Sequence, residues 1–139
     1  MIKISEFTDI PYAVTDQVAV ITINRPDRYN ALRGRTVDEL IYAFRYAYVD
    51  KGVAAIILTG AGTKAFCSGG DQKQRNETGG YGETEMGMFE IDRLHRVIRE
   101  VPKPVIAAVN GFAIGGGHVL HVLCDVSLAA STAKFGQVG

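Results

Sequence analysis

The chain has 139 residues, a formal net charge of +0 at pH 7 and 47% hydrophobic residues. This composition predicts one compact domain over residues 1–139 and excludes a disordered or fibrous chain. Because nucleic-acid and membrane-surface binders usually carry a basic excess, neither kind of partner is predicted. The N-terminus lacks the apolar core of a signal peptide, and no apolar run could span a bilayer. Because the two cysteines, Cys67 and Cys124, form no disulfide framework, we expect the reducing cytoplasm as the location.

Strands and a helix alternate in the first half of the chain. Residues 17–26 are rich in Val and Ile and end at a proline, which predicts a strand. Residues 36–52 predict a helix that begins with a capping box of Thr36 and Glu39. Residues 53–60 are apolar on both faces, as in a strand buried between layers. The apolar stripe of the helix comprises Val37, Leu40, Ile41, Phe44 and Tyr48.

The second half continues this alternation after a long polar segment. Residues 61–84 are rich in glycine and polar side chains and predict a loop, and residues 85–99 predict an amphipathic helix. The remaining expected elements are a strand within 102–111, a helix over 115–125 that is buried all round, and short strands over 126–131 and 134–137. Such alternation indicates an α/β fold with largely parallel strands.

Two segments share a plan in which a buried strand leads into a glycine-rich turn. They are "IILTGAGTKAFCSGGD" and "VIAAVNGFAIGGGHVL". Glycine lets a ligand approach backbone N–H groups closely, and two such donors from separate loops can form an oxyanion hole. The same glycines also suit two tight turns in an α/β core. The glycine pattern alone favours the turns.

A third glycine pattern suggests a different class of protein. The segment "GAGTKA" at 60–65 matches the G-x-G-x-x-G/A pattern of dinucleotide-binding loops and follows a predicted strand. The residues after it, "FCSGGD", do not open a helix, so no helix N-terminus would face a pyrophosphate. An NAD(P)-binding oxidoreductase is therefore a weaker alternative.

Three motifs together resemble the crotonase (enoyl-CoA hydratase/isomerase) superfamily. They are "NRPDRYNAL", "AFCSGGD" and "VNGFAIGGGHVLHVLCD". The resemblance implies a spiral of β-β-α turns, an acyl-CoA thioester as ligand, and an oxyanion hole made by the N–H groups of Gly70 and Gly116. It also implies a homotrimer or a dimer of trimers, built with C-terminal helices that are absent from this chain. We therefore expect the chain to be a fragment, or, if it is complete, an inactive scaffold.

Hydratases of this family use two glutamates to handle water, and neither is found here. The matching positions hold Val119 and Gly139. Without an acid/base pair there is no evident route to add water across an enoyl double bond. A simple enoyl-CoA hydratase is therefore not expected.

Within the family, "SGGDQKQRNETGGY" is similar to the loop of 1,4-dihydroxy-2-naphthoyl-CoA synthases, which close a ring in menaquinone synthesis. The resemblance implies that Tyr81 hydrogen-bonds the substrate and relays a proton, while Lys73 and Arg75 order the loop or meet coenzyme A phosphates. A solvated charged loop is the open alternative, and Asp71 also suits a simple cap of the following turn. The implied substrate and coenzyme A contacts are Arg28, Ser68, Gly69, Asp71, Gln72, Lys73, Arg75, Ile114 and Gly115.

The end of the chain bears on the choice between two related reactions. In one subgroup of the synthases a Q-T-G segment binds bicarbonate as the base, and here Gln137 and Gly139 flank Val138, which lacks the threonine hydroxyl. The synthases also carry a basic residue for coenzyme A where this chain has Tyr29, so Arg28 would have to substitute. "FGQVG" is closer to 2-ketocyclohexanecarboxyl-CoA hydrolases, which open an alicyclic ring. The loop favours the synthase, with the hydrolase as the alternative.

Several reactive side chains are interpreted as structural. His118, His121 and Cys124 cannot all face one point and have no evident fourth partner, so no metal site is predicted. Cys67 has no histidine nearby in sequence, which argues against a nucleophile. His95 lies within an amphipathic helix.

Overall fold

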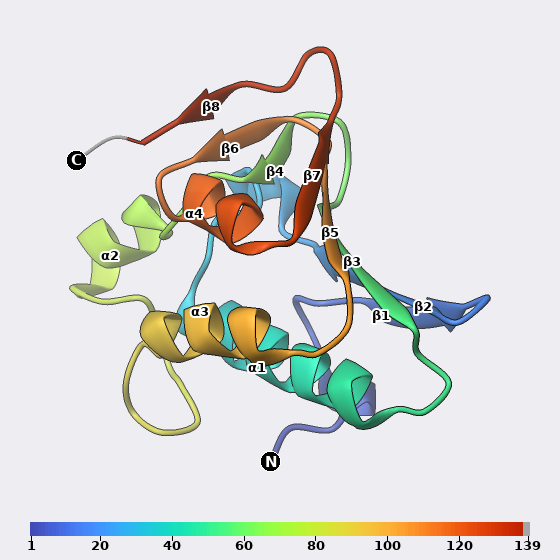
Figure 1. Cartoon of the computed structure of the whole chain (residues 1–139). Helices are drawn as coiled ribbons and strands as arrows, with labels where there is room; N and C mark the ends of the chain where they lie inside the picture. Colours follow the sequence, from blue (N-terminus) through green and yellow to red (C-terminus); the bar gives the residue numbers. More distant parts are fainter. Residues whose placement is uncertain (138–139) are drawn as a thin grey trace.

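The computed structural model describes residues 1–137 and shows two sheets with helices around them (Figure 1). The strands are β1 (Tyr12–Thr15), β2 (Val18–Ile23), β3 (Ala55–Gly60), β4 (Ala65–Cys67), β5 (Val105–Val109), β6 (Phe112–Ile114), β7 (Val126–Ala129) and β8 (Phe135–Gly136). The helices are α1 (Gly34–Val49), α2 (Gln72–Thr78), α3 (Ile91–Glu100) and α4 (Gly116–Leu123), with short 3-10 turns η1 (Ile4–Glu6) and η2 (Pro26–Arg28).

One sheet has the strand order β1-β2-β3-β5-β7 and the other has the order β4-β6-β8. The β1–β2 pair is antiparallel, whereas β2–β3, β3–β5, β5–β7, β4–β6 and β6–β8 are parallel. The expected α/β class with largely parallel strands is therefore confirmed. The antiparallel β1 was not foreseen, because its side chains are largely exposed and give no apolar pattern.

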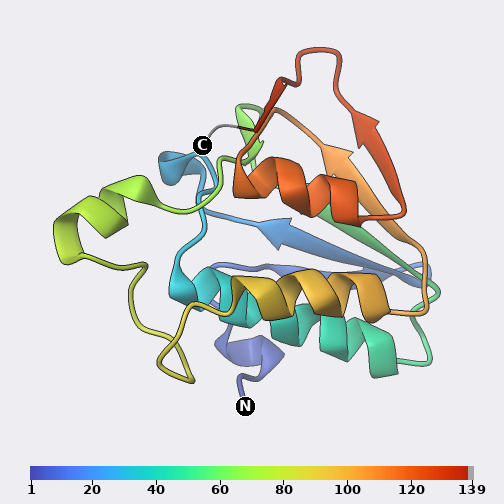
Figure 2. The same cartoon turned by 60° about the vertical axis from the view of Figure 1, so that its left-hand side comes forward.

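The helices separate into two levels. Helices α1 and α3 run side by side, and α4 lies between α3 and the smaller sheet (Figures 1 and 2). A single core joins them, because one face of strands β2, β3 and β5 and one stripe each of α1, α3 and α4 exclude water. The largest fully buried apolar side chains include Ile21, Ile23, Leu40, Phe44, Ile56, Leu58, Phe66, Leu94 and Leu120. None of the helices among residues 1–137 is long and apolar enough to cross a membrane.

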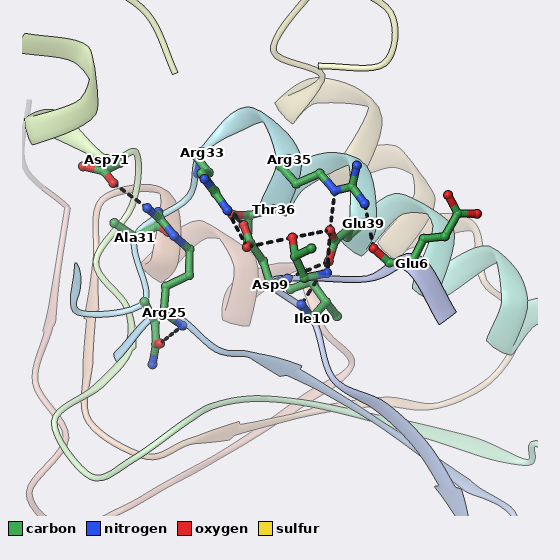
Figure 3. Close-up of polar contacts among 12 residues, drawn as sticks. Glu6, Asp9, Ile10, Arg25, Ala31, Arg33, Arg35, Thr36, Glu39 and Asp71 are labelled. Atoms are coloured by element: carbon green, nitrogen blue, oxygen red, sulfur yellow. Dashed lines mark hydrogen bonds and ion pairs between the residues drawn. The ribbon is translucent and has the colours of Figure 1, made fainter. Parts of the chain in front are cut away.

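The expected capping box at the start of α1 is wrong. The helix begins at Gly34, two residues before Thr36, and its apolar stripe is buried as predicted except for the exposed Tyr48. Glu39 is fully buried and accepts hydrogen bonds from the backbone N–H groups of Thr8, Asp9 and Ile10 at 2.9–3.1 Å (Figure 3). Its carboxylate therefore fixes the N-terminal segment against α1 instead of capping the helix.

The loop predicted over 61–84 contains strand β4 and helix α2. Asp71 is the N-cap of α2, where its carboxylate accepts the Gln74 N–H at 3.0 Å, and Gly79 ends the helix in the left-handed region at φ 81°. No side chain of α2 is buried, so the segment lacks the apolar period that identifies a helix in sequence. Figure 1 shows this helix standing at the edge of the fold.

Two further predictions need correction. The helix expected over 85–99 is α3, which begins only at Ile91. The residues before it, 81–90, run across the N-terminal end of α1, where the Glu85 N–H donates to the Asp38 carboxylate. The helix expected over 115–125 is not buried all round: Gly117 and Leu120 face the core, whereas Val122 is 59% exposed. The short strand β6 within the second glycine segment was also missed.

The buried Glu39 carboxylate should contribute strongly to stability. Glu39→Ala leaves three backbone N–H groups and the Arg35 guanidinium without their acceptor, so we expect the free energy of unfolding to fall by about 3–5 kcal/mol. Urea denaturation measures this change. The control is Glu100→Ala at the exposed end of α3, which should stay within about 0.5 kcal/mol of the unchanged protein. Equal losses in the two variants would contradict this account of Glu39.

Candidate active site

The first glycine loop is held by a backbone clamp with Leu32. The Leu32 N–H donates to the Gly69 carbonyl at 2.7 Å, and the Asp71 N–H donates to the Leu32 carbonyl at 2.8 Å. In a trans peptide the C=O and N–H point in opposite directions. Since the Gly69 carbonyl points at Leu32, the Gly70 N–H points away from it. Among residues 1–137 that N–H donates to no acceptor.

The second glycine loop presents its donor in the same way. Gly115 adopts φ 56° at the end of β6, and its carbonyl accepts the Val119 N–H at 3.1 Å as the first bond of α4. The N–H on the other side of that peptide belongs to Gly116 and points out of the helix N-terminus. Within the described part of the chain it also has no acceptor.

Close packing brings the two loops together. A methyl group on Gly117 would overlap the Cys67 carbonyl oxygen and lie 2.6 Å from its carbon, so α4 rests directly on the backbone of β4. A methyl group on Gly69 would lie 3.1 Å from the Gly116 nitrogen. The structure thus places the two predicted donor loops in van der Waals contact. The catalytic role of Gly70 and Gly116 stays a prediction.

Tyr81 lies directly over the first of these glycines. A methyl group on Gly70 would be 2.8 Å from Tyr81 Cε1 and 2.9 Å from its hydroxyl oxygen. The ring stacks on Phe89 with centroids 4.3 Å apart, and the Tyr81 carbonyl accepts the Gly34 N–H at 2.7 Å. The phenol predicted to meet the substrate is therefore fixed beside the predicted oxyanion donor.

Asp71 occupies an ion-paired pocket at the end of this loop. Its carboxylate is 2% exposed and accepts from Arg25 Nη2 at 2.9 Å and Arg28 Nη1 at 3.3 Å (the Arg25 pair appears in Figure 3). Burial alone would raise the pKa of this carboxyl. The Gln74 N–H and the two guanidinium groups outweigh burial and hold the pKa below its ordinary value. Asp71 is therefore an ionised N-cap, as one of the two sequence interpretations had it.

The other residues predicted to contact the substrate or coenzyme A differ in how closely they approach Tyr81, Asp71 and the glycine loops. Arg28 shares the Asp71 carboxylate and keeps 31% of its side chain exposed. Gln72 donates to the Tyr81 hydroxyl at 3.5 Å, and Arg75 lies 6.0 Å from the Tyr81 ring centroid, whereas Lys73 is simply exposed on α2. Ser68 and Ile114 are half-buried beside the glycines. Gln137 is the last described residue, and Gly139 lies outside the described residues.

Two residues of the motif "NRPDRYNAL", Arg25 and Asn30, support the site and were not predicted from the sequence. Arg25 pairs with Asp71, and the fully buried Asn30 accepts the Arg25 N–H at 2.8 Å and donates to the Ala65 carbonyl at 2.7 Å. Tyr29 and Asn30 both adopt positive φ, at 54° and 55°. The only sequence signal was the tolerance of asparagine for the left-handed region. A cavity of about 390 Å³ lies between this turn and the "GAGTKA" loop, with Lys64 in its lining.

The side chains of His118 and His121 have local hydrogen-bond partners, and Cys67 is a buried free thiol. Burial raises the pKa of the Cys67 thiol to about 12, so it is not a thiolate at neutral pH. The His118 and His121 rings hydrogen-bond each other at 2.9 Å, and His121 Nδ1 contacts Ser127 Oγ at 2.9 Å. No group of three metal-ligating side chains is found among residues 1–137. The "GAGTKA" loop leads into β4 and not into a helix, so it lacks the setting of a pyrophosphate site.

The enoyl-CoA hydratase/isomerase family model matches residues 13–139. The chain belongs to this family. A solved enoyl-CoA hydratase/carnitine racemase from Magnetospirillum magneticum is 35% identical, with a TM-score of 0.83 over 94% of this chain and 49% of that chain. An enoyl-CoA hydratase from Bacillus anthracis is 34% identical, with a TM-score of 0.82 over 92% of this chain and 50% of that chain.

An enoyl-CoA hydratase from Mycobacterium avium subsp. paratuberculosis gives a similar result, at 35% identity and a TM-score of 0.78 over 91% of this chain and 49% of that chain. These matches confirm the α/β crotonase-like fold. The chain spans about half the length of each of these solved structures.

The close packing of α4 on β4 makes a direct test of the site geometry possible. Gly117→Ala places a methyl group on the Cys67 carbonyl, so we expect the free energy of unfolding to fall by about 3 kcal/mol. The neighbouring Gly116→Ala is the matched control, because its methyl group would have no atom nearer than 3.5 Å and should cost less than about 1 kcal/mol. Thermal denaturation compares the two variants, and equal effects would contradict the contact.

Proposed function

We propose that the protein acts on an acyl-CoA thioester and holds its carbonyl oxygen between the N–H groups of Gly70 and Gly116 while the thioester becomes an enolate. The observation that carries this proposal is that both N–H groups lack an acceptor within residues 1–137 and belong to loops in contact. Donors fixed before the reaction stabilise the charge that develops on the oxygen, more than they stabilise the neutral carbonyl.

The neighbouring side chains favour carbon–carbon chemistry over hydration. Val119 and Gly139 stand where the family's hydratases carry glutamates, so these two positions supply no carboxylate pair to activate and deliver water. The Tyr81 hydroxyl lies beside Gly70 and can hydrogen-bond the substrate and relay a proton. Gly69, Gly115 and Ile114 form the wall around the thioester.

The finer proposal is a ring-forming 1,4-dihydroxy-2-naphthoyl-CoA synthase. Loss of the proton next to the thioester gives the enolate, whose carbon attacks the carbon of the substrate's second carboxyl group. The adduct loses water as the ring closes, and the ring ketone tautomerises to the aromatic product. The second candidate is a 2-ketocyclohexanecarboxyl-CoA hydrolase, favoured by "FGQVG". There water adds to the ring ketone, the carbon–carbon bond breaks, and the resulting thioester enolate takes up a proton.

Coenzyme A would be held from the loop side of the site. Arg28, Lys73 and Arg75 all keep part of their cationic side chains in solvent near α2, where phosphate groups could reach them. Bicarbonate as the base for the synthase is a weaker part of the proposal, since Val138 lacks a hydroxyl. We also propose a trimer or a dimer of trimers for the full-length protein.

A panel of thioesters separates these reactions. The full-length protein is given o-succinylbenzoyl-CoA, 2-ketocyclohexanecarboxyl-CoA or crotonyl-CoA, each with and without bicarbonate, and products are identified by mass spectrometry. We expect turnover of the aromatic substrate and none of crotonyl-CoA. Turnover of the alicyclic thioester alone would replace the synthase with the hydrolase, and hydration of crotonyl-CoA would overturn both.

Tyr81 should matter for turnover much more than for binding. Tyr81→Phe keeps the ring stacked on Phe89 but removes the hydroxyl beside Gly70, so we expect kcat to fall about 100-fold while KM changes less than about threefold. Steady-state kinetics on the accepted thioester measure both constants. Tyr48→Phe, on the exposed face of α1, is the matched control and should keep wild-type kinetics. An unchanged kcat in Tyr81→Phe would remove Tyr81 from the mechanism.

A further inference from the structure

A buried ion pair connects the first sequence motif to the predicted oxyanion loop. Arg25 keeps only 11% of its side chain exposed, and both terminal nitrogens are used: Nη1 donates to the Ala31 carbonyl at 2.6 Å and Nη2 donates to the Asp71 carboxylate at 2.9 Å (Figure 3). A buried guanidinium occupied in this way has no free donor fork for a substrate phosphate.

The partner of Arg25 is the residue that follows Gly70. The Asp71 carboxylate accepts from Arg25, while the Asp71 N–H donates to the Leu32 carbonyl at 2.8 Å. Both the side chain and the backbone of Asp71 are thus bound to the segment 25–32. The peptide groups on either side of Gly70 are fixed by these bonds, although the Gly70 N–H makes none itself.

The segment that holds Asp71 is itself anchored in the core. Asn30 is fully buried, accepts the Arg25 N–H and donates to the Ala61 and Ala65 carbonyls at 3.0 and 2.7 Å. The two consecutive positive φ angles at Tyr29 and Asn30 are maintained by this network. Arg25 therefore connects an anchored turn to a loop whose geometry would decide where an oxyanion is held.

We propose that Arg25 is a positioning residue, which acts through the Asp71 carboxylate to aim the Gly70 N–H at the thioester oxygen. This inference rests on the proposed function, because it concerns the same donor. It assigns to Asp71 the role of holding the loop, in place of a direct contact with substrate or coenzyme A. Small displacements of an oriented group can reduce a rate by about 100-fold, so the ion pair should affect enolate stabilisation without affecting affinity for coenzyme A.

The test uses acetoacetyl-CoA, a β-keto thioester whose enolate absorbs in the near ultraviolet. The full-length protein should increase the enolate fraction of the bound probe at a given pH. In Arg25→Met we expect the enolate-to-ketone ratio of the bound probe to fall roughly tenfold to a hundredfold. The dissociation constant of coenzyme A, measured by calorimetry, should stay within about twofold of wild type.

A second variant keeps the test decisive if Arg25→Met does not fold. Asp71→Asn retains an acceptor for the Gln74 N–H, so α2 keeps its N-cap, but it loses the charge that pairs with Arg25. It should show the same loss of enolate. The matched control is Glu39→Gln, which removes the charge of another buried carboxyl group, paired with Arg35 at 2.5 Å and bonded to the backbone of residues 8–10 and not to the segment 25–32. This control should lose stability but keep the wild-type enolate ratio.

Each outcome decides one question. If the wild-type protein binds the probe without increasing its enolate, the proposed function is wrong and the inference fails with it. If the wild-type protein enolises the probe and Arg25→Met and Asp71→Asn do so equally well, only the inference is overturned. An equal loss in Glu39→Gln would assign the effect to general destabilisation and would also overturn it.

Discussion

The contact between the backbone of β4 and the first turn of α4 determines the geometry of the candidate site. At Gly117 the helix lies so close to the Cys67 carbonyl that no side chain fits between them. This contact sets the separation of the two glycine loops, since one loop leaves β4 and the other enters α4. Because both β4 and α4 contribute to the packed core, core packing sets the separation of the two loops. The direction of the Gly70 N–H within its loop depends in addition on the bonds that Gly69 and Asp71 make with Leu32.

Buried carboxyl groups fix other segments of the backbone, at the N-terminus and at the starts of α1 and α2. Glu39 holds the N-terminal segment on α1, Asp9 binds Arg33 and Thr36, and Asp71 holds the start of α2 (Figure 3). Each accepts several hydrogen bonds, which offsets the cost of removing a charge from water. The N-terminal segment and the first turns of α1 and α2 are thus fixed by hydrogen bonds to buried carboxyl groups.

The part of the fold that could be predicted from sequence is the part rich in apolar side chains. Strands β2, β3 and β5 were found as short apolar runs rich in Val, Ile and Ala, and the buried stripe of α1 was found because its apolar side chains recur at helical spacing. Helix α2 was missed because it buries nothing. The two glycine loops and Tyr81 were located through motifs. The ion pair of Arg25 was not, because its partner Asp71 lies 46 residues away and no residue pattern near either side chain indicates the pairing.

Helix α2 has a thermodynamic consequence that follows from its lack of buried side chains. It is fixed at its N-cap by Asp71 and closed by Gly79, and between them its residues contribute little to the core. Such a segment can open locally at a small cost in free energy while the rest of the protein stays folded. Evolution can therefore alter the residues of α2, and with them the surface beside the two glycine loops, almost independently of the stability of the fold.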